Sequence, residues 1–359
     1  MVHVVLLIVC AAAIYLSCEW FVNAVEWLGQ RLNIGKMAVG TVLAAFGTAL
    51  PESVVTLVAV TTGPTAEIRN IGVGAAMGGP LVLATVAYGV TGAMLLLRRR
   101  SNRREMVLVG VGAARLVERA TIERGAENCD AVLADPAHTA RLAKDQRWFM
   151  AVFLVKVALG LVAFAIKPWL GLLFFAVYGV YFWREIRGAT IGEHDEEELA
   201  PLKLQPRATR PATTAVLIQT LGALAIIFVS SQIFVYQLDA IGPMLGLSGA
   251  VAALLLSPIA TELPEIMNAI IWVRQGKTQL ALANISGAMM IQATVPSGLG
   301  LLFTDWRLDH ALLWSGAITM AAITYLLVTM RANKLTPTRL ALAALFYLVF
   351  AAGLIPVLT

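Results

Sequence analysis

Ten apolar segments, each about the length that crosses a bilayer, constrain this chain more than any other feature of its sequence. A transmembrane helix needs about 20 predominantly apolar residues. Of the 359 residues, 59% are hydrophobic and only 14% are charged, whereas a soluble domain carries about 25% charged residues. The sequence therefore predicts an all-α membrane protein in a lipid bilayer. The predicted helices are residues 3–28, 36–62, 70–97, 148–166, 168–187, 212–236, 243–273, 278–303, 310–330 and 338–357.

The basic residues between these helices predict their orientation. If the N-terminus lies outside the cell, the inner segments carry 23 of the lysines and arginines and the outer segments carry 3. Cytoplasmic loops are enriched in these residues. We therefore expect both termini outside, and the two longest connections, 98–147 and 188–211, in the cytoplasm. No interleaved aromatic residues accompany the basic run, so no nucleic-acid partner is expected.

The order of the helices predicts two inverted halves. Five helices precede the acidic linker 188–211 and five follow it, and an odd number per half reverses the second half in the membrane. We expect a first five-helix repeat at 1–187, with 98–147 as a cytoplasmic insertion, and a second at 212–359. Inverted repeats are typical of secondary transporters, whose ion sites lie at the membrane midplane between broken helices.

The second helix of each half contains a proline beside a carboxylate where neither is expected. Residues 47–52 read GTALPE and residues 260–265 read ATELPE, with four of six positions identical and the prolines 213 residues apart. Pro51 lacks an N–H, so the carbonyl of Gly47 loses its helical partner, which hydrocarbon tolerates only beside protein or a wet cavity. Glu52 adds a charge that costs about 2.5–3.5 kcal/mol at the centre of a membrane helix.

These groups together predict a cation site. A freed carbonyl, a threonine hydroxyl and a carboxylate within one turn form an oxygen cluster, and hard cations prefer oxygen. Pro264 frees the carbonyl of Ala260 in the same way. Glu262 and Glu265 are three residues apart and are expected to share a helix face.

Four further polar or proline positions lie within predicted helices. Asn284 and Gln292 are too polar for lipid and are expected to face the site, although an interhelical hydrogen bond would also explain each of them. Lys156 is in mid-helix and needs an internal partner, for which Glu19 is a candidate. Pro80 frees the carbonyl of Ala76 and predicts a further break near the first motif.

With both motifs in view, the chain resembles the cation/calcium exchanger superfamily, that is, the membrane domain of the sodium/calcium exchangers and its bacterial branch. That family has ten spans in two inverted repeats, with a Gly-Thr-Ser-x-Pro-Glu-like motif on spans two and seven. The resemblance is clearest over 36–90 and 250–300. It implies that Glu52 and Glu265 are the central calcium ligands and that Thr48 and Thr261 add oxygens. The full set of expected metal ligands is Glu52, Glu265, Thr48, Thr261, Glu262, Ala49, Gly47, Ala260, Asn284 and Gln292.

The chain departs from the family pattern on spans three and eight. Where the family has a Gly-Ser-Asn-like run, this chain has Gly-Gly-Pro at 78–80 and Gly-Ala-Met at 287–289, so the neutral ligands expected for sodium are missing. Glu262 adds a titratable carboxylate instead. Crowded carboxylates repel one another, so Glu262 could carry a proton, or Lys156 could balance the charge. Sodium and proton coupling therefore both stay open.

The resulting functional prediction is a secondary antiporter, not an enzyme. It would export Ca²⁺ in exchange for Na⁺ or H⁺ by alternating access, with spans one and six sliding past the other eight, as the resemblance implies. These ions are substrates, and no cofactor is expected. A bacterial inner membrane is the expected location, and the oligomeric state stays open. The alternatives are a passive cation channel and an intramembrane metal-dependent enzyme, although the chain has no His-Glu-x-x-His motif.

Overall fold

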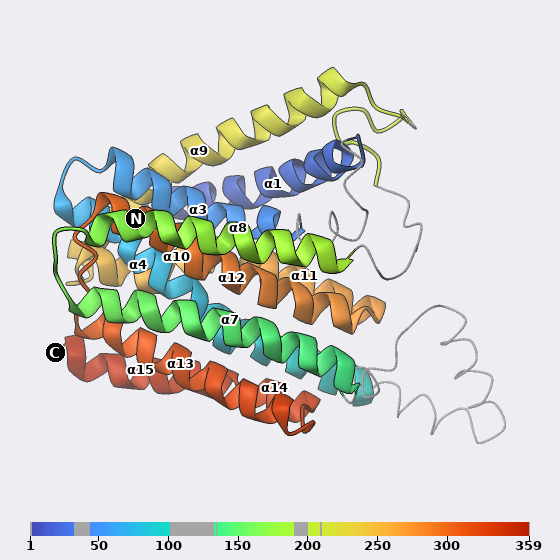
Figure 1. The fold of residues 1–359 in the computed structure, drawn as a ribbon. Helices are drawn as coiled ribbons and strands as arrows, with labels where there is room; N and C mark the ends of the chain where they lie inside the picture. The colour runs from blue at the N-terminus through green and yellow to red at the C-terminus, as the bar shows by residue number, and fades with distance from the viewer. Residues whose placement is uncertain are drawn as a thin grey trace.

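The computed structural model of this chain consists of long α-helices whose axes are roughly aligned (Figure 1). The structure describes residues 2–31, 44–100, 133, 135–189, 200–208 and 210–358, and no strand occurs among them. The helices of the first half are α1 (Val2–Arg31), α3 (Ala44–Thr62), α4 (Ala66–Val82), α7 (Pro136–Leu161) and α8 (Leu170–Ala189). Those of the second half are α9 (Thr213–Met244), α10 (Gly249–Thr261), α11 (Leu263–Gln275), α12 (Thr278–Phe303), α13 (His310–Arg331), α14 (Pro337–Leu342) and α15 (Ala344–Leu358).

These elements give ten membrane crossings in the described part of the chain. The α4 helix continues through a π-helical turn, Leu83–Ala87, so that its crossing is Ala66–Arg100. The pairs α10 with α11 and α14 with α15 each form one crossing. Seven of these helical segments are apolar and long enough to span a membrane, and Ala49–Thr62 of α3 is a shorter apolar helix. The α7 and α8 helices bring the described chain to ten long helical segments.

The helix boundaries differ from the prediction mainly at α7 and α9. The α7 helix begins at Pro136 rather than 148, because the Asp135 side chain accepts a hydrogen bond from the Ala137 N–H (3.0 Å) and Pro136 suits the first helical position. The last twelve residues of the predicted insertion 98–147 are therefore helical. The α9 helix runs to Met244 instead of 236. No proline interrupts it before Pro243, which lies in its last turn.

The prolines act differently from one another. Pro51 lies inside α3, and the helix continues through it. In the second half the helix is interrupted at Glu262, between α10 and α11, and Pro264 lies in the first turn of α11, where its missing N–H costs little. The further break predicted at Pro80 is wrong, because α4 continues through that residue.

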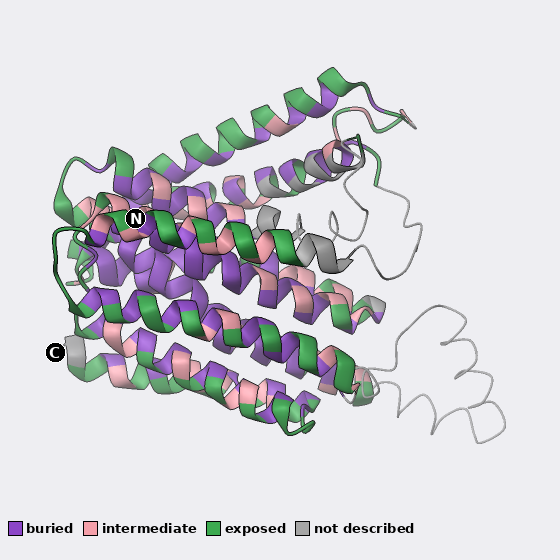
Figure 2. Ribbon diagram, viewed as in Figure 1, coloured by how far each residue is buried: buried purple, intermediate pink, exposed green. Residues whose placement is uncertain are grey.

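The two halves interlock at the centre of the bundle. Both α3 and α4 pack against helices of the other half, α3 on α12 and α4 on α10. A Cβ atom at Gly74 would lie 2.0 Å from the Ala250 carbonyl oxygen, and one at Gly78 would lie 2.6 Å from that of Leu254. These glycines let α4 and α10 approach closely, as small residues do between membrane helices. Figure 2 shows that buried residues dominate these central helices, whereas the outward side of α9 is exposed.

The α1 and α9 helices form a pair at one side of the bundle (Figure 1). Residues 200–208 pack against them, where Asn23 and Trp27 donate hydrogen bonds to the Ala200 carbonyl oxygen at 3.3 and 3.0 Å. Glu19 forms an ion pair with Lys203 at 2.9 Å, and both side chains are partly exposed. The candidate pairing of Glu19 with Lys156 is therefore wrong.

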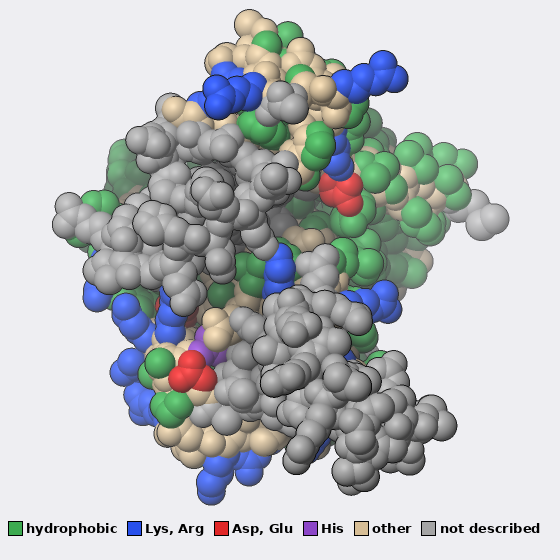
Figure 3. Space-filling view, turned by 90° about the vertical axis from the view of Figure 1, so that its right-hand side faces the viewer, with side chains coloured by type: hydrophobic (Ala, Val, Ile, Leu, Met, Phe, Trp, Pro, Cys, Tyr) green, Lys and Arg blue, Asp and Glu red, His purple; other side chains and the backbone are tan. Residues whose placement is uncertain are grey.

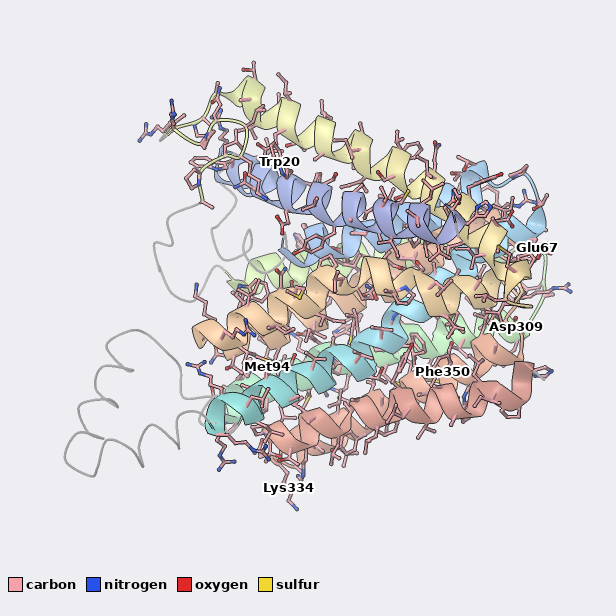
Figure 4. All side chains as sticks on the ribbon, turned by 180° about the vertical axis from the view of Figure 1, so that it is seen from behind. Trp20, Glu67, Met94, Asp309, Lys334 and Phe350 are labelled. Carbon is pink, nitrogen blue, oxygen red and sulfur yellow. The ribbon has the colours of Figure 1, made fainter. Side chains whose placement is uncertain are left out.

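The connections place particular residues at opposite ends of the bundle. Glu67 and Asp309 lie at one end, and Met94 and Lys334 lie at the other (Figure 4). Both chain termini lie at the end that carries Glu67 (Figure 1). Lysine and arginine side chains gather at the rim of the other end (Figure 3).

Candidate functional site

Three glutamates of the two motifs are completely buried: Glu52, Glu262 and Glu265 each have 0% exposed surface. Glu52 comes from α3, Glu262 from the interruption after α10, and Glu265 from the first turn of α11. A carboxylate at this depth is costly unless a proton, a cation or hydrogen-bond donors compensate its charge.

The Thr261 hydroxyl joins the two halves of the molecule. Its oxygen lies 2.8 Å from Glu52 Oε2 and 3.1 Å from Glu262 Oε1. A hydroxyl has one proton to donate, so it can serve only one of the two carboxylates at a time. The repeated motif thus brings an oxygen of α3 and two oxygens of the α10–α11 interruption together.

Gln292 adds the α12 helix to this cluster. Its Nε2 donates to Glu262 Oε2 at 2.7 Å. Neither Gln292 Oε1 nor Glu52 Oε1 has a hydrogen-bond partner among the described residues, and both atoms are buried. Buried acceptors nearly always have a partner, and a bound cation would supply it, because oxygen atoms are the ligands that hard cations prefer.

The α4 helix forms one wall of the cluster with a glycine. A Cβ atom at Gly79 would lie 2.7 Å from Gln292 Oε1 and 3.0 Å from Glu262 Oε1. Gly79 therefore leaves the space that these two polar groups occupy. The sequence showed only that a polar family ligand is missing at 78–80, and it held no signal that Glu262 reaches this position from another helix.

Lys156 of α7 contacts the α4 helix three residues before Gly79. The side chain is fully buried, and its Nζ donates to the Ala76 carbonyl oxygen at 2.8 Å and lies 4.7 Å from the centre of the Phe153 ring. Pro80 removes the usual helical donor to that carbonyl. The predicted internal partner of Lys156 is thus the backbone oxygen that this proline frees.

The remaining predicted ligands are placed with less detail. The structure describes the backbone of Gly47, Thr48 and Ala260 but not their surroundings. Ala49 is buried among apolar side chains. Asn284 is 1% exposed, and within the described chain neither polar atom of its side chain has a hydrogen-bond partner.

The described part of the structure brings together only some of the predicted metal ligands. No three His, Cys, Asp or Glu side chains of the described residues lie close enough together to hold a metal ion. The groups that do meet are the Glu52 and Glu262 carboxylates, the Thr261 hydroxyl and the Gln292 amide. Two carboxylates with neutral oxygens are a donor set for a hard cation such as Ca²⁺.

Comparison with known proteins assigns the chain to a family. The family described as "Sodium/calcium exchanger protein" matches residues 2–186 and 215–355. The CaxA protein of Alkalimonas amylolytica, which its name proposes to be an antiporter, is 25% identical over 89% of this chain and 87% of its own length. The inner membrane protein YrbG of Escherichia coli (strain K12) is 24% identical over 85% of this chain and 81% of its own length.

Solved structures share the fold. The H⁺/Ca²⁺ exchanger CAX matches with a TM-score of 0.69 and 16% identity, over 98% of this chain and 82% of its own chain. The sodium–calcium exchanger NCX_Mj matches with a TM-score of 0.58 and 16% identity, over 98% of both chains. The predicted fold class is thereby confirmed as an all-α membrane protein with two inverted five-helix repeats. The family match spans both halves and both copies of the motif, and the chain therefore belongs to the sodium/calcium exchanger family.

Proposed function

We propose that this protein is a secondary antiporter of the bacterial inner membrane that exports Ca²⁺ in exchange for Na⁺ or H⁺. The observation that carries the proposal is the meeting of Glu52 and Glu262, two fully buried carboxylates from opposite halves, at the Thr261 hydroxyl. A site shared by two inverted repeats can be opened alternately to either side of a membrane.

The ligand set follows from this contact. Ca²⁺ would bind the Glu52 and Glu262 carboxylates, the Thr261 hydroxyl and Gln292 Oε1. The remaining positions, to a total of about six to eight oxygens, would be filled from Glu265, the Gly47 and Ala260 carbonyls, Thr48 and Asn284. Ala49 would line the site without binding.

The α1–α9 pair would be the moving part. Both helices pack against α3 and α10, which carry Glu52 and Thr261. Asn23 of α1 donates to the Ala200 carbonyl oxygen and Gln219 of α9 accepts from the Leu204 N–H, so residues 200–208 tie the two helices together. The pair would slide as one unit over the site and expose it first to one side and then to the other.

Calcium flux into proteoliposomes tests this function. A sodium gradient and a proton gradient are imposed in separate experiments, without ATP. Uptake of Ca²⁺ against its own gradient under at least one of them is the expected result. Flux that only dissipates the calcium gradient would make the protein a channel, and the absence of any flux would overturn the proposal.

Replacing Glu262 by glutamine should lower calcium transport, because it removes a proposed charged ligand, and should flatten the pH dependence of the transport that remains. In the wild-type protein we expect transport to fall on acidification, because a proton and Ca²⁺ compete for the same carboxylate. The amide of Glu262→Gln cannot take up this proton, so its profile should lose most of that slope. Glu19→Gln, which removes a partly exposed carboxylate paired with Lys203, is the matched control and should keep it. An unchanged profile in Glu262→Gln, with flux that follows only sodium, would rule out proton coupling.

The orientation can be tested with single cysteines. In a variant without Cys10, Cys18 and Cys129, we expect Glu67→Cys to react with a membrane-impermeant maleimide in intact cells and Lys334→Cys to react only after permeabilisation. Both positions are exposed and they lie at opposite ends of the bundle (Figure 4). The reverse pattern of labelling would show that both termini lie in the cytoplasm.

A further inference from the structure

Several buried hydroxyl groups have no hydrogen-bond partner in the described part of the chain. Buried threonines elsewhere, such as Thr85 and Thr319, donate to the carbonyl oxygen one turn earlier, at 2.6 and 2.8 Å, as threonines in helices commonly do. Fully buried hydroxyls without any such bond belong to Thr56, Ser231, Ser257 and Ser297. Buried polar groups nearly always have a partner, so these hydroxyls indicate a ligand or a conformation in which they gain one.

Three of these hydroxyls lie on helices that surround Glu52. Thr56 is on α3, Ser257 is on α10, and Ser231 is on α9, which packs against both of the other helices. The three helices share one cluster of buried apolar side chains, which includes Val55, Val58, Ala59, Ile227, Phe234, Val235 and Ala253. None of the described α12 residues belongs to this cluster, so Ser297 of α12 is set apart from the other three hydroxyls.

Thr56 and Ser257 are each one turn away from the contact between the two halves. Thr56 follows Glu52 by four residues and Ser257 precedes Thr261 by four, so each shares a helix face with that neighbour, about 6 Å along the axis. The Ser257 carbonyl also accepts from the Thr261 hydroxyl at 3.2 Å. The α3 helix ends and the α10 helix begins at the end of the bundle that carries Glu67. Both hydroxyls are therefore displaced from the contact toward that end.

The repeated motif does not account for these two hydroxyls. The position that corresponds to Thr56 in the second repeat is Ala269, and the position that corresponds to Ser257 in the first repeat is Ala44. In an inverted repeat, such corresponding positions lie on opposite sides of the central site. At these positions the chain thus has hydroxyls on the Glu67 side of the site and alanines on the other side.

We propose that Thr56, Ser231 and Ser257 line the route by which the cation passes between Glu52 and the end of the bundle that carries Glu67. The inference rests on the proposed exchange, in which the α1–α9 pair moves. A shift of α9 would carry Ser231 away from α3 and α10 and open the space between these helices. The three hydroxyls would then replace part of the water that the cation loses on entry, because hard cations bind neutral oxygens as well as carboxylates.

Cysteine labelling tests the route. Thr56→Cys, Ser231→Cys and Ser257→Cys are each introduced into the cysteine-free protein and reconstituted in liposomes that exchange calcium. A small, permanently charged methanethiosulfonate reagent is added either to the side on which Glu67→Cys reacts or to the opposite side. We expect all three cysteines to react from the Glu67 side and none from the opposite side.

Ala269→Cys is the matched control, because it takes the position of Thr56 in the second repeat and is equally buried, with 0% exposed surface. It should stay unreactive toward reagent on the Glu67 side. Unreactive cysteines at the three hydroxyl positions, in protein that exchanges calcium, would overturn the proposal. Equal reaction from both sides, or reaction of Ala269→Cys from the Glu67 side, would overturn it as well.

Removal of the hydroxyls is a second measurement that does not depend on cysteine. Thr56→Val and Ser231→Ala should be at least as stable as the wild-type protein in thermal unfolding, because neither hydroxyl has a partner in this conformation. The rate of calcium exchange should nevertheless fall about tenfold in each variant, as expected for the loss of one hydrogen bond or ion contact during passage, and the Kd for calcium should not change. Wild-type rates in both variants would contradict a role in the route.

These experiments separate the route from the proposed exchange. If calcium flux only dissipates its own gradient while the three cysteines react from the Glu67 side alone, the exchange is refuted and the route stands. If calcium uptake is coupled to sodium or protons while the cysteines stay unreactive, the route alone is refuted.

Discussion

Replacing Glu52 or Glu265 by glutamine should abolish calcium exchange, with a loss of about a hundredfold or more, because the affinity of a calcium site depends steeply on the number of charged ligands. Glutamine keeps the size and one oxygen of the side chain but removes the negative charge. Both carboxylates are fully buried, so bulk water does not reach them in this conformation to replace the lost charged oxygen.

The measurement is calcium uptake into proteoliposomes, with calcium binding to detergent-solubilised protein as a second readout. Glu67→Gln is the matched control, because Glu67 is an exposed carboxylate at the end of the bundle (Figure 4), and this variant should transport as the wild-type protein does. Normal uptake by Glu52→Gln would remove the carboxylate on which the proposed site depends. Normal uptake by Glu265→Gln alone would reduce the ligand set to Glu52 and Glu262.

Hydropathy predicted the crossings well, because each helix must bury about the same apolar length in the membrane. The predicted helix 278–303 coincides with α12, whose two ends are marked by a change from apolar to polar residues. The start of α7 was missed because residues 136–147 are polar, and their helix depends on the Asp135 cap rather than on hydropathy. Hydropathy reports the membrane segment and not its helical extension beyond the membrane.

The prolines show which features of the structure local sequence patterns do not predict. The sequence indicated that Pro80 frees the carbonyl of Ala76, but the consequence depends on which donor reaches that carbonyl from elsewhere. Pro80 leaves α4 continuous, and a lysine from α7, 80 residues later in sequence than Ala76, donates to the carbonyl. At Glu262 the helix is interrupted, and the Glu262 carboxylate accepts a hydrogen bond from the Gln292 side chain. Such pairings are tertiary, and one sequence without relatives does not reveal them.

The sequence predicted a cluster of polar side chains shared by the two halves, but only some of the residues that form it. The repeated motif named Glu52, Thr261 and Glu262, which the structure brings together, and hydropathy named Gln292, which joins them. Their assignment as metal ligands stays a prediction. Gly79 was missed as a wall of the site, because the Gly-Gly-Pro run at 78–80 predicted a helix break and not a contact with Glu262.

Gly79→Ala should therefore lower calcium transport by about tenfold or more while leaving the protein folded, since a single misplaced group in a metal site typically costs 10–100-fold. The added Cβ would lie 2.7 Å from Gln292 Oε1 and 3.0 Å from Glu262 Oε1, which is too close for either contact. Both atoms are at the ends of flexible side chains, so they can move aside without a shift of the backbone. The displacement would fall on the two polar groups that are proposed to bind the cation.

Gly179→Ala on α8 is the matched control, because a Cβ atom there meets nothing within 4 Å. Both substitutions replace a helical glycine by alanine, so the change in helix propensity is the same, and thermal unfolding in detergent should show both variants to be at least as stable as the wild-type protein. Shortening the opposing side chain in Gly79→Ala/Gln292→Asn should recover part of the lost transport, because one methylene group less makes room for the added Cβ. Wild-type transport by Gly79→Ala would mean that the space beside Glu262 and Gln292 is not used by the cation.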